Sequence, residues 1–114
     1  MVDETYNKKA LYVIVNIGFA EEVAEIMRKE GAGGATIMNA RGVGAVPQSI
    51  FGITIDTEKE IILSVVDEDV SVRIIHAIRE NAGLGSSSHS ICFTMPVERF
   101  VMTSTPMKPK KQPE

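Results

Sequence analysis

The sequence predicts a single α+β domain in which a four-stranded antiparallel sheet carries two helices on one face. Short apolar runs rich in Val, Ile and Tyr alternate with two longer segments whose apolar residues recur at helical spacing. The chain has 114 residues, of which 44% are hydrophobic, so one core can form. These segments follow one another in the order strand, helix, strand, strand, helix, strand.

The first strand is Lys9–Ile17, a short run dominated by β-branched and aromatic residues. In the segment that follows, apolar residues recur at helical spacing from Phe19 to Met27. Acidic residues stand in its first turn and basic residues in its last, as the helix dipole favours, and Gly31 is a stop signal. This segment is therefore predicted to be an amphipathic helix of about three turns.

The second strand, residues 34–42, is β-branched but interrupted by small residues. The third centres on the nearly continuous apolar run Glu60–Val66, as expected of a central strand buried on both faces. The alternation at Ile53, Thr54 and Ile55 leaves open an earlier start for this strand.

The second helix is expected over residues 69–83, with Asp67 or Asp69 as its cap and Gly83 as its end. The last strand is expected over residues 90–102, with Pro96 near its end or on an edge. This order of elements is that of the ferredoxin-like βαββαβ fold. Both helices then cover one face of the sheet, and the apolar opposite face is expected to oligomerise or to bind something flat.

Composition excludes several classes of protein. The net charge of −3 provides no basic field for nucleic acid or for a membrane surface, and no run is long enough for membrane insertion. A single cysteine and a start unlike a signal peptide indicate a cytoplasmic protein. We expect one domain over residues 1–105 and a Pro- and Lys-rich, disordered tail over 106–114.

Four stretches resemble the PII family of nitrogen-regulatory signal proteins and its PII-like relatives. They are "GAGGATIMNARGVG", "EKEIILSVVDED", "AGLG" and "SICFTMPVERF", in that order and at that spacing. The resemblance implies a homotrimer that binds an adenine nucleotide (ATP, ADP or AMP) between subunits and requires no cofactor. It also implies a T-loop, here residues 44–58, that regulates a target such as a transporter or a metabolic enzyme of nitrogen or carbon metabolism.

The resemblance places the effector near two groups of residues. The first group lies on the second strand and at the two ends of the T-loop: Thr36, Gly42, Gly44 and Lys59. The second is the loop before the last strand: Gly85, Ser86, Ser87, Ser88, His89 and Ser90. Backbone N–H groups and hydroxyls of this second group can bind an anion, but a polar turn explains the same string.

The sequence departs from the family where the phosphate ligands are expected. Uncharged residues replace a basic residue, a glutamine, a lysine and two arginines, at Ala45, Val46, Ile91, Met102 and Ser104 respectively. Each lost cation removes a charge-assisted hydrogen bond of about 1.5–3 kcal/mol, so ATP is expected to bind more weakly than in the family.

The loop 44–58 carries residues suited to contacting a partner protein, namely Val46, Gln48, Ile50 and Phe51. The alternative is a hairpin extension whose Phe51 packs back on the sheet. Arg41 and Lys59 each fit either a ligand contact or a solvated strand-end charge.

No set of residues predicts catalysis or a metal site. His76 is expected on the surface and Cys92 as a small buried hydrophobe. No Cys or His has metal-ligand spacing, and we expect a protein that is not an enzyme. A CutA-like or other ferredoxin-fold trimer, with a structural, metal-linked or non-nucleotide role, is the alternative.

Overall fold

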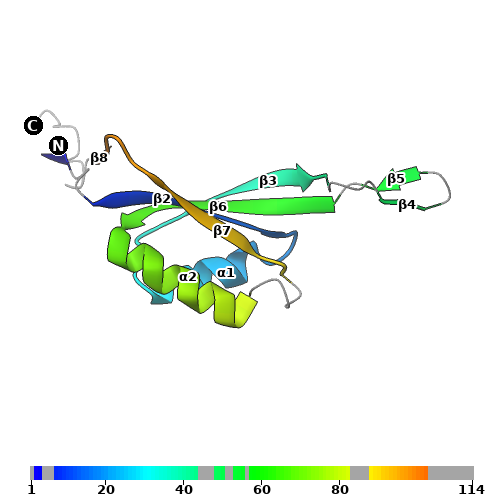
Figure 1. The fold of residues 1–114 in the computed structure, drawn as a ribbon, viewed down its shortest axis with the longest axis horizontal. Helices are drawn as coiled ribbons and strands as arrows, with labels where there is room; N and C mark the ends of the chain where they lie inside the picture. Colours follow the sequence, from blue (N-terminus) through cyan, green and yellow to red (C-terminus); the bar gives the residue numbers. More distant parts are fainter. Residues whose placement is uncertain are drawn as a thin grey trace, which may run out of the picture.

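A four-stranded antiparallel sheet with two helices on one face forms the body of the protein, which confirms the predicted fold class (Figure 1). The structure is a computed structural model, and it describes residues 2–3, 7–43, 48–50, 53–55, 57–82 and 88–102. Within these ranges the sheet has the strand order β3-β6-β2-β7. Two smaller two-stranded sheets, β1-β8 and β4-β5, complete the described strands.

The elements of the body match the predicted order. Its strands are β2 (Lys8–Asn16), β3 (Thr36–Gly42), β6 (Thr57–Asp67) and β7 (Ile91–Pro96). Its helices are α1 (Ala20–Lys29) and α2 (Glu68–Ala82). The long apolar strand β6 lies between β3 and β2, as its continuous hydrophobic run predicted.

The short strands are the main difference from the prediction. β4 (Gln48–Ile50) and β5 (Ile53–Ile55) pair inside the predicted loop, and β6 already begins at Thr57. The predicted last strand is divided into β7 and β8 (Val101–Met102), and β8 pairs with β1 (Val2–Asp3). Runs of two or three residues are too short for a clear periodic signal. The alternation at Ile53–Ile55 left open an earlier start of β6, whereas the structure makes these residues a separate strand, β5, paired with β4.

The core lies between the sheet and the two helices. Leu11, Val13 and Val15 of β2 point to this side and are fully buried. The other large side chains buried there come from both helices and from β6: Val23, Met27, Ile62, Ile74 and Ile78. Because side chains alternate along a strand, every second residue of β2 and β6 faces this core, and the residues between them face away.

The C-terminal end of α1 follows the predicted stop at Gly31. Gly31 has a φ of 117°, which favours glycine. The Gly31 N–H donates to Arg28 O, and the Ala32 N–H donates to Met27 O, which is the Schellman arrangement. The guanidinium of Arg73 in α2 donates to Glu30 O at 3.1 Å, so the second helix helps to cap the first.

The N-terminal end of α1 is capped from a distant strand. Its N-cap residue, Phe19, makes no side-chain cap, and Glu60 of β6 supplies the acceptor instead. One carboxylate oxygen of Glu60 accepts hydrogen bonds from Gly18 N at 3.0 Å and Ala20 N at 3.1 Å. A negative charge at this position also complements the helix dipole. The sequence gives no local sign of this cap, because 40 residues separate Glu60 from Ala20.

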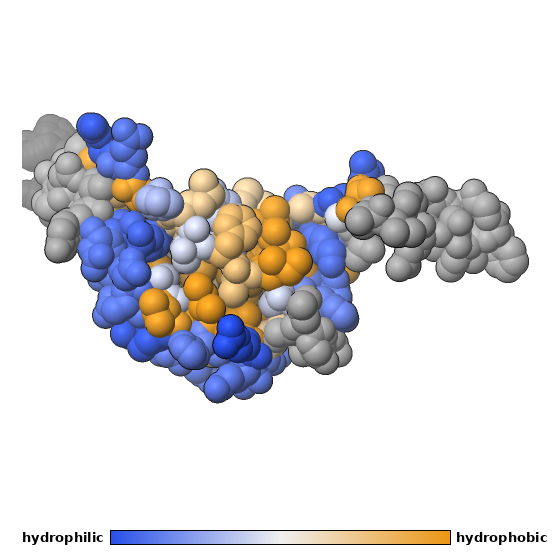
Figure 2. Space-filling view, viewed as in Figure 1, coloured by the Kyte–Doolittle hydropathy of each residue, from blue (hydrophilic) through white to orange (hydrophobic). Residues whose placement is uncertain are grey.

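No described helix covers the second face of the sheet. In Figure 1 both helices lie below the sheet, and Figure 2 shows apolar residues gathered above the polar surface of the helices. The strand register assigns to this face the apolar residues Ala10, Tyr12, Ile14, Met38, Ile61, Leu63, Val65, Ile91, Phe93 and Met95. We call this set the open face. Tyr12 and Phe93 stack on it with ring centroids 5.1 Å apart, and Ile91 and Met95 are about half exposed, at 53% and 47%.

Replacing Glu60 by Ala removes the acceptor of the N–H groups of Gly18 and Ala20 at the start of α1. We expect the free energy of unfolding to fall by about 1–2 kcal/mol, as for the loss of a side-chain cap. Urea unfolding of this variant should be compared with that of Glu80→Ala, which changes an exposed glutamate of α2. Equal stability of the two variants would contradict the capping role.

Candidate functional site

Glu58, Lys59 and Glu60 near the start of β6 bind the segment that leads from the end of β2 into α1. The Ile17 N–H donates to Glu58 O at 3.2 Å, and Lys59 Nζ donates to Asn16 Oδ1 at 2.7 Å. Glu60 then binds the N–H groups at the start of α1. The end of the sheet next to loop 44–56 is therefore fixed by three consecutive residues, and they belong to the strand into which that loop leads.

An open cleft of about 580 Å³ lies at this end of the sheet. Ile17 follows β2 and Val43 follows β3, and the other lining residues lie on β3 and β6: Asn39, Ala40, Arg41, Glu58 and Lys59. By the strand register Arg41 and Glu58 point to the helix side of the sheet, whereas the side chain of Lys59 points to the opposite face. Such a site can take an anionic ligand with an apolar part, because Ile17 and Val43 are 51% and 71% exposed beside the charges.

The structure brings together only some of the residues that the sequence singled out. Lys59 and Arg41 both line the cleft, and Gly42 stands between two lining residues, Arg41 and Val43. Thr36 begins the same strand six residues earlier. At about 3.3 Å per residue this is roughly 20 Å from Gly42, so Thr36 is not part of the cleft.

The segment 88–90 joins the same end of the sheet through its backbone. The Asn16 N–H donates to Ser88 O at 2.9 Å. The Ser88 hydroxyl donates to Ala82 O at 2.7 Å and lies 3.0 Å from the Ser90 hydroxyl, and both serines are buried. These hydroxyls therefore form hydrogen bonds at the C-terminal end of α2. His89 between them is exposed, with a φ of 50°.

Several predicted residues lie outside the described part of the chain. Among the effector residues these are Gly44, Gly85, Ser86 and Ser87, and among the partner residues Val46 and Phe51. The predicted tail 106–114 and the helix stop Gly83 lie outside it as well. Gln48 and Ile50 belong to β4, which is described by its backbone pairing with Ile55 and Ile53.

Asn16 is not among the site residues predicted from the sequence. Its side chain binds the Lys59 ammonium, its N–H binds Ser88, and its carbonyl accepts from Phe19 N at 3.2 Å. One residue thus connects the cleft, the segment 88–90 and the turn into α1. In the sequence Asn16 stands out only as a polar residue at the end of an apolar strand. Many surface asparagines occupy the same position, so this signal does not single it out.

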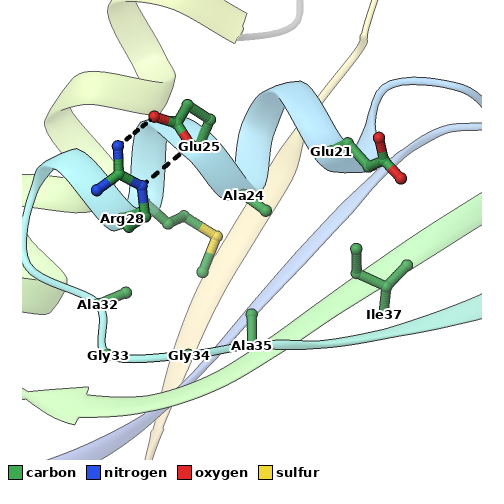
Figure 3. A pocket seen from close by; sticks show the side chains of 10 residues that line it. Glu21, Ala24, Glu25, Arg28, Ala32, Gly33, Gly34, Ala35 and Ile37 are labelled. Atoms are coloured by element: carbon green, nitrogen blue, oxygen red, sulfur yellow. Dashed lines mark hydrogen bonds and ion pairs between the residues drawn. The ribbon is translucent and has the colours of Figure 1, made fainter.

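A second hollow, of about 270 Å³, lies between α1 and the start of β3 and holds none of the predicted site residues. Figure 3 shows Ala24 of α1 opposite Gly33, Gly34 and Ala35, with the paired Glu25 and Arg28 at the rim. The hollow exists because small residues line both sides. The Ser64 hydroxyl fixes its strand wall by donating to Gly34 O.

Neither a metal site nor a membrane-spanning helix is found among the described residues. No group of three or more His, Cys, Asp or Glu side chains in the described ranges could hold a metal ion. None of the helices in that part of the chain is long and apolar enough to cross a membrane. His76 is exposed on α2, as predicted. Cys92 is half-buried against the core, and burial raises the pKa of its thiol while the charge of Arg79 opposes this.

Comparison with known proteins gives one family and a set of similar folds. The sequence model of the family described as nitrogen regulatory protein P-II matches residues 8–106. Among solved structures, B. subtilis GlnK matches with a TM-score of 0.68 and 14% identity, over 86% of this chain and 91% of that one. No curated protein sequence matches the chain.

Two further solved structures are PII-like proteins. CPII, a nitrogen regulatory PII-like protein from Thiomonas intermedia K12, matches with a TM-score of 0.61 and 14% identity, over 83% of this chain and 93% of that one. The CPII structure is bound to ADP, AMP and bicarbonate. A PII-like signaling protein from Thermus thermophilus matches with a TM-score of 0.60 and 22% identity, over 77% of this chain and 84% of that one.

The raised pKa of Cys92 has two consequences that can be measured. A neutral thiol reacts slowly, so alkylation at pH 8 should be slower in the folded chain than in the chain unfolded in urea. The unfolded chain also loses its thiol proton first. The free energy of unfolding should therefore fall as the pH rises through the usual thiol range, near about 8.5, and Cys92→Ser should lose this slope. Equal alkylation rates in both states would contradict the burial of the thiol.

Proposed function

The chain belongs to the nitrogen regulatory protein P-II family, and from this premise we propose that it is a PII-like signalling protein without enzymatic activity. It binds a small effector in clefts between the subunits of a homotrimer. The effector changes the loop 44–58, and this loop regulates a target protein. The observation that carries the proposal is the cleft beside that loop, which is lined by residues at the paired ends of β3 and β6, Arg41 and Glu58 among them.

The open face supports the trimer. Ten apolar residues form it, and large ones among them remain partly exposed in the single chain. Full burial of a side chain such as Phe or Met contributes about 1.5–3 kcal/mol, so the pairing of open faces is strongly favoured. In a homotrimer the three open faces meet in the centre, and the helices remain outside.

Adenine nucleotides are the first candidates for the effector. CPII binds ADP and AMP, and it has the same fold at 14% identity. Among the described residues, the charged residues that line the cleft are Arg41, Glu58 and Lys59. Uncharged residues stand where the family's phosphate ligands are expected, at Ala45, Val46, Ile91, Met102 and Ser104. Compared with other family members, this chain should therefore prefer nucleotides that carry fewer phosphates than ATP.

The loop is well placed to report on the cleft. The pairing of β3 and β6 beside it stops at Gly42 and Thr57, next to the lining residues Val43 and Glu58. A ligand in the cleft therefore contacts the positions from which the loop leaves the sheet. The ligand can shift the equilibrium between two states of the loop only by the ratio of its affinities for those states. The target, a transporter or an enzyme of nitrogen or carbon metabolism, then binds one of these states, and the protein acts in the cytoplasm.

Introducing a charge on the open face should break the trimer. We expect Phe93→Glu to sediment as a monomer at micromolar concentration, because three carboxylates would be buried close together in the assembly. Val72→Glu is the matched control, since Val72 is an equally apolar, 47% exposed residue on the outside of α2. A wild-type chain that sediments as a monomer would refute the trimer, and loss of assembly in both variants would refute the role of the open face.

A thermal-shift screen tests the effector. The ligands are ATP, ADP, AMP, cyclic dinucleotides, 2-oxoglutarate and bicarbonate, each with and without Mg²⁺. A ligand that binds only the folded state raises the melting temperature, and at a hundred times its Kd it contributes about 2.7 kcal/mol. We expect a shift with AMP or ADP that is lost in Lys59→Ala and kept in Lys29→Ala, which changes an exposed lysine of α1. No shift with any nucleotide would count against the proposed effector.

A further inference from the structure

We propose that Asn39 is the residue that recognises the base of the effector. Its side-chain amide accepts a hydrogen bond from the 6-amino group of adenine and donates one to N7, while the phosphate lies toward Arg41. The inference rests on the proposed function, because it names a specificity residue within the cleft where the effector binds. The ligand class that it requires is a purine nucleotide with an amino group at position 6.

The strand register places Asn39 and Arg41 on the helix side of the sheet. Asn39 of β3 stands opposite Glu60 of β6, and directly opposite residues point to the same face. The Glu60 carboxylate binds the start of α1, so this face is the one that carries the helices. Arg41 stands two residues further along β3, about 7 Å from Asn39, and both line the cleft.

The described contacts of the fold do not use the Asn39 amide. Asn39 is exposed, and no group of the described residues forms a hydrogen bond with its side chain. The carboxylate opposite it, that of Glu60, binds Gly18 N and Ala20 N instead. Asparagine is also disfavoured in strands. The wall of the cleft therefore presents an amide whose donor and acceptor are both available to a ligand.

The charges on the helix side of the cleft balance, so a neutral group has to distinguish its ligands. Arg41 carries one positive charge, and Glu58 opposite it carries one negative charge. A guanidinium can bind one phosphate, but that contact is the same for every nucleotide, whereas contacts to the base differ. Among the described residues that line the cleft, Asn39 is the one with an uncharged polar side chain.

An amide side chain matches adenine and not the 6-oxo purines. Adenine presents the donor of its 6-amino group beside the acceptor N7, and an asparagine binds both. Hypoxanthine and guanine carry an oxygen at position 6, so the amide oxygen would face a second acceptor. In AMP one ribose separates the base from the phosphate, which suits the spacing of Asn39 and Arg41. Ile17, which is 51% exposed, adds an apolar surface to the same cleft.

Calorimetric titration of the wild-type chain with AMP, IMP and 7-deaza-AMP tests the inference. IMP carries an oxygen in place of the 6-amino group, and 7-deaza-AMP carries a C–H group in place of N7. Each ligand loses one of the two proposed contacts and keeps the phosphate. We expect AMP to bind about tenfold more tightly than IMP and about three- to tenfold more tightly than 7-deaza-AMP.

Asn39→Ala completes the cycle between protein and ligand. In this variant AMP should bind no more tightly than 7-deaza-AMP, within about twofold, because the amide that distinguishes them is gone. Asn81→Ala is the matched control and should keep the wild-type preference, since Asn81 is an exposed asparagine of α2 whose amide donates to Ala77 O at 2.8 Å. Circular dichroism and melting temperature report whether each variant is folded.

Two outcomes would overturn the inference and leave the proposed function standing. The wild-type chain could bind AMP and IMP equally, or Asn39→Ala could keep the wild-type ratio of affinities for AMP and 7-deaza-AMP. If the variant does not fold, the wild-type chain decides: equal affinity for AMP and 7-deaza-AMP overturns the inference, and a preference for AMP supports it. If the wild-type chain binds none of the three nucleotides, the proposed effector fails and the inference with it.

Discussion

The structure depends on one constraint: its sheet has two apolar faces, and the described part of the chain supplies only enough helix to cover one. Leu11, Val13 and Val15 are buried beneath α1 and α2, whereas Phe93 and Met95 on the other face are more than 40% exposed. A chain of this size cannot leave such a face in water without a cost. The proposed assembly through the open face rests on this constraint, and the proposed site lies at the margin of that face, where the strands end beside the loop 44–58.

Polar residues concentrate at that margin because the sheet pairing stops there. At the start of β6, three consecutive residues bind the turn after β2: Glu58 through its carbonyl, Lys59 and Glu60 through their side chains. The alternation of a strand places the charge of Lys59 on the open side and that of Glu60 on the helix side. The carboxylate thereby binds the start of α1, while the neighbouring ammonium binds Asn16 Oδ1 on the other face of the sheet.

The periodic elements could be predicted from the sequence, and the non-local contacts could not. Hydrophobic spacing predicted both helices, the four strands of the body and the stop at Gly31, because these depend on neighbouring residues. The cap of α1 by Glu60 and the bond between Lys59 and Asn16 join residues more than 35 positions apart, and they follow only from the register of β2 and β6. The resemblance indicated Lys59 as an effector residue, and the structure places it among the residues that line the cleft. It also placed Ser88 and Ser90 near the effector, and the structure shows their hydroxyls 3.0 Å apart, with that of Ser88 also bonded to Ala82 O.

The central claim is that the open face and the cleft belong to one assembly that senses a nucleotide. Native mass spectrometry of the full chain with increasing AMP or ADP tests both parts in one experiment, because it measures the assembly and its bound ligands together. The account predicts a species of three chains that takes up as many as three nucleotides, one for each cleft. A monomer that binds nucleotide, or a trimer that binds none, would contradict it.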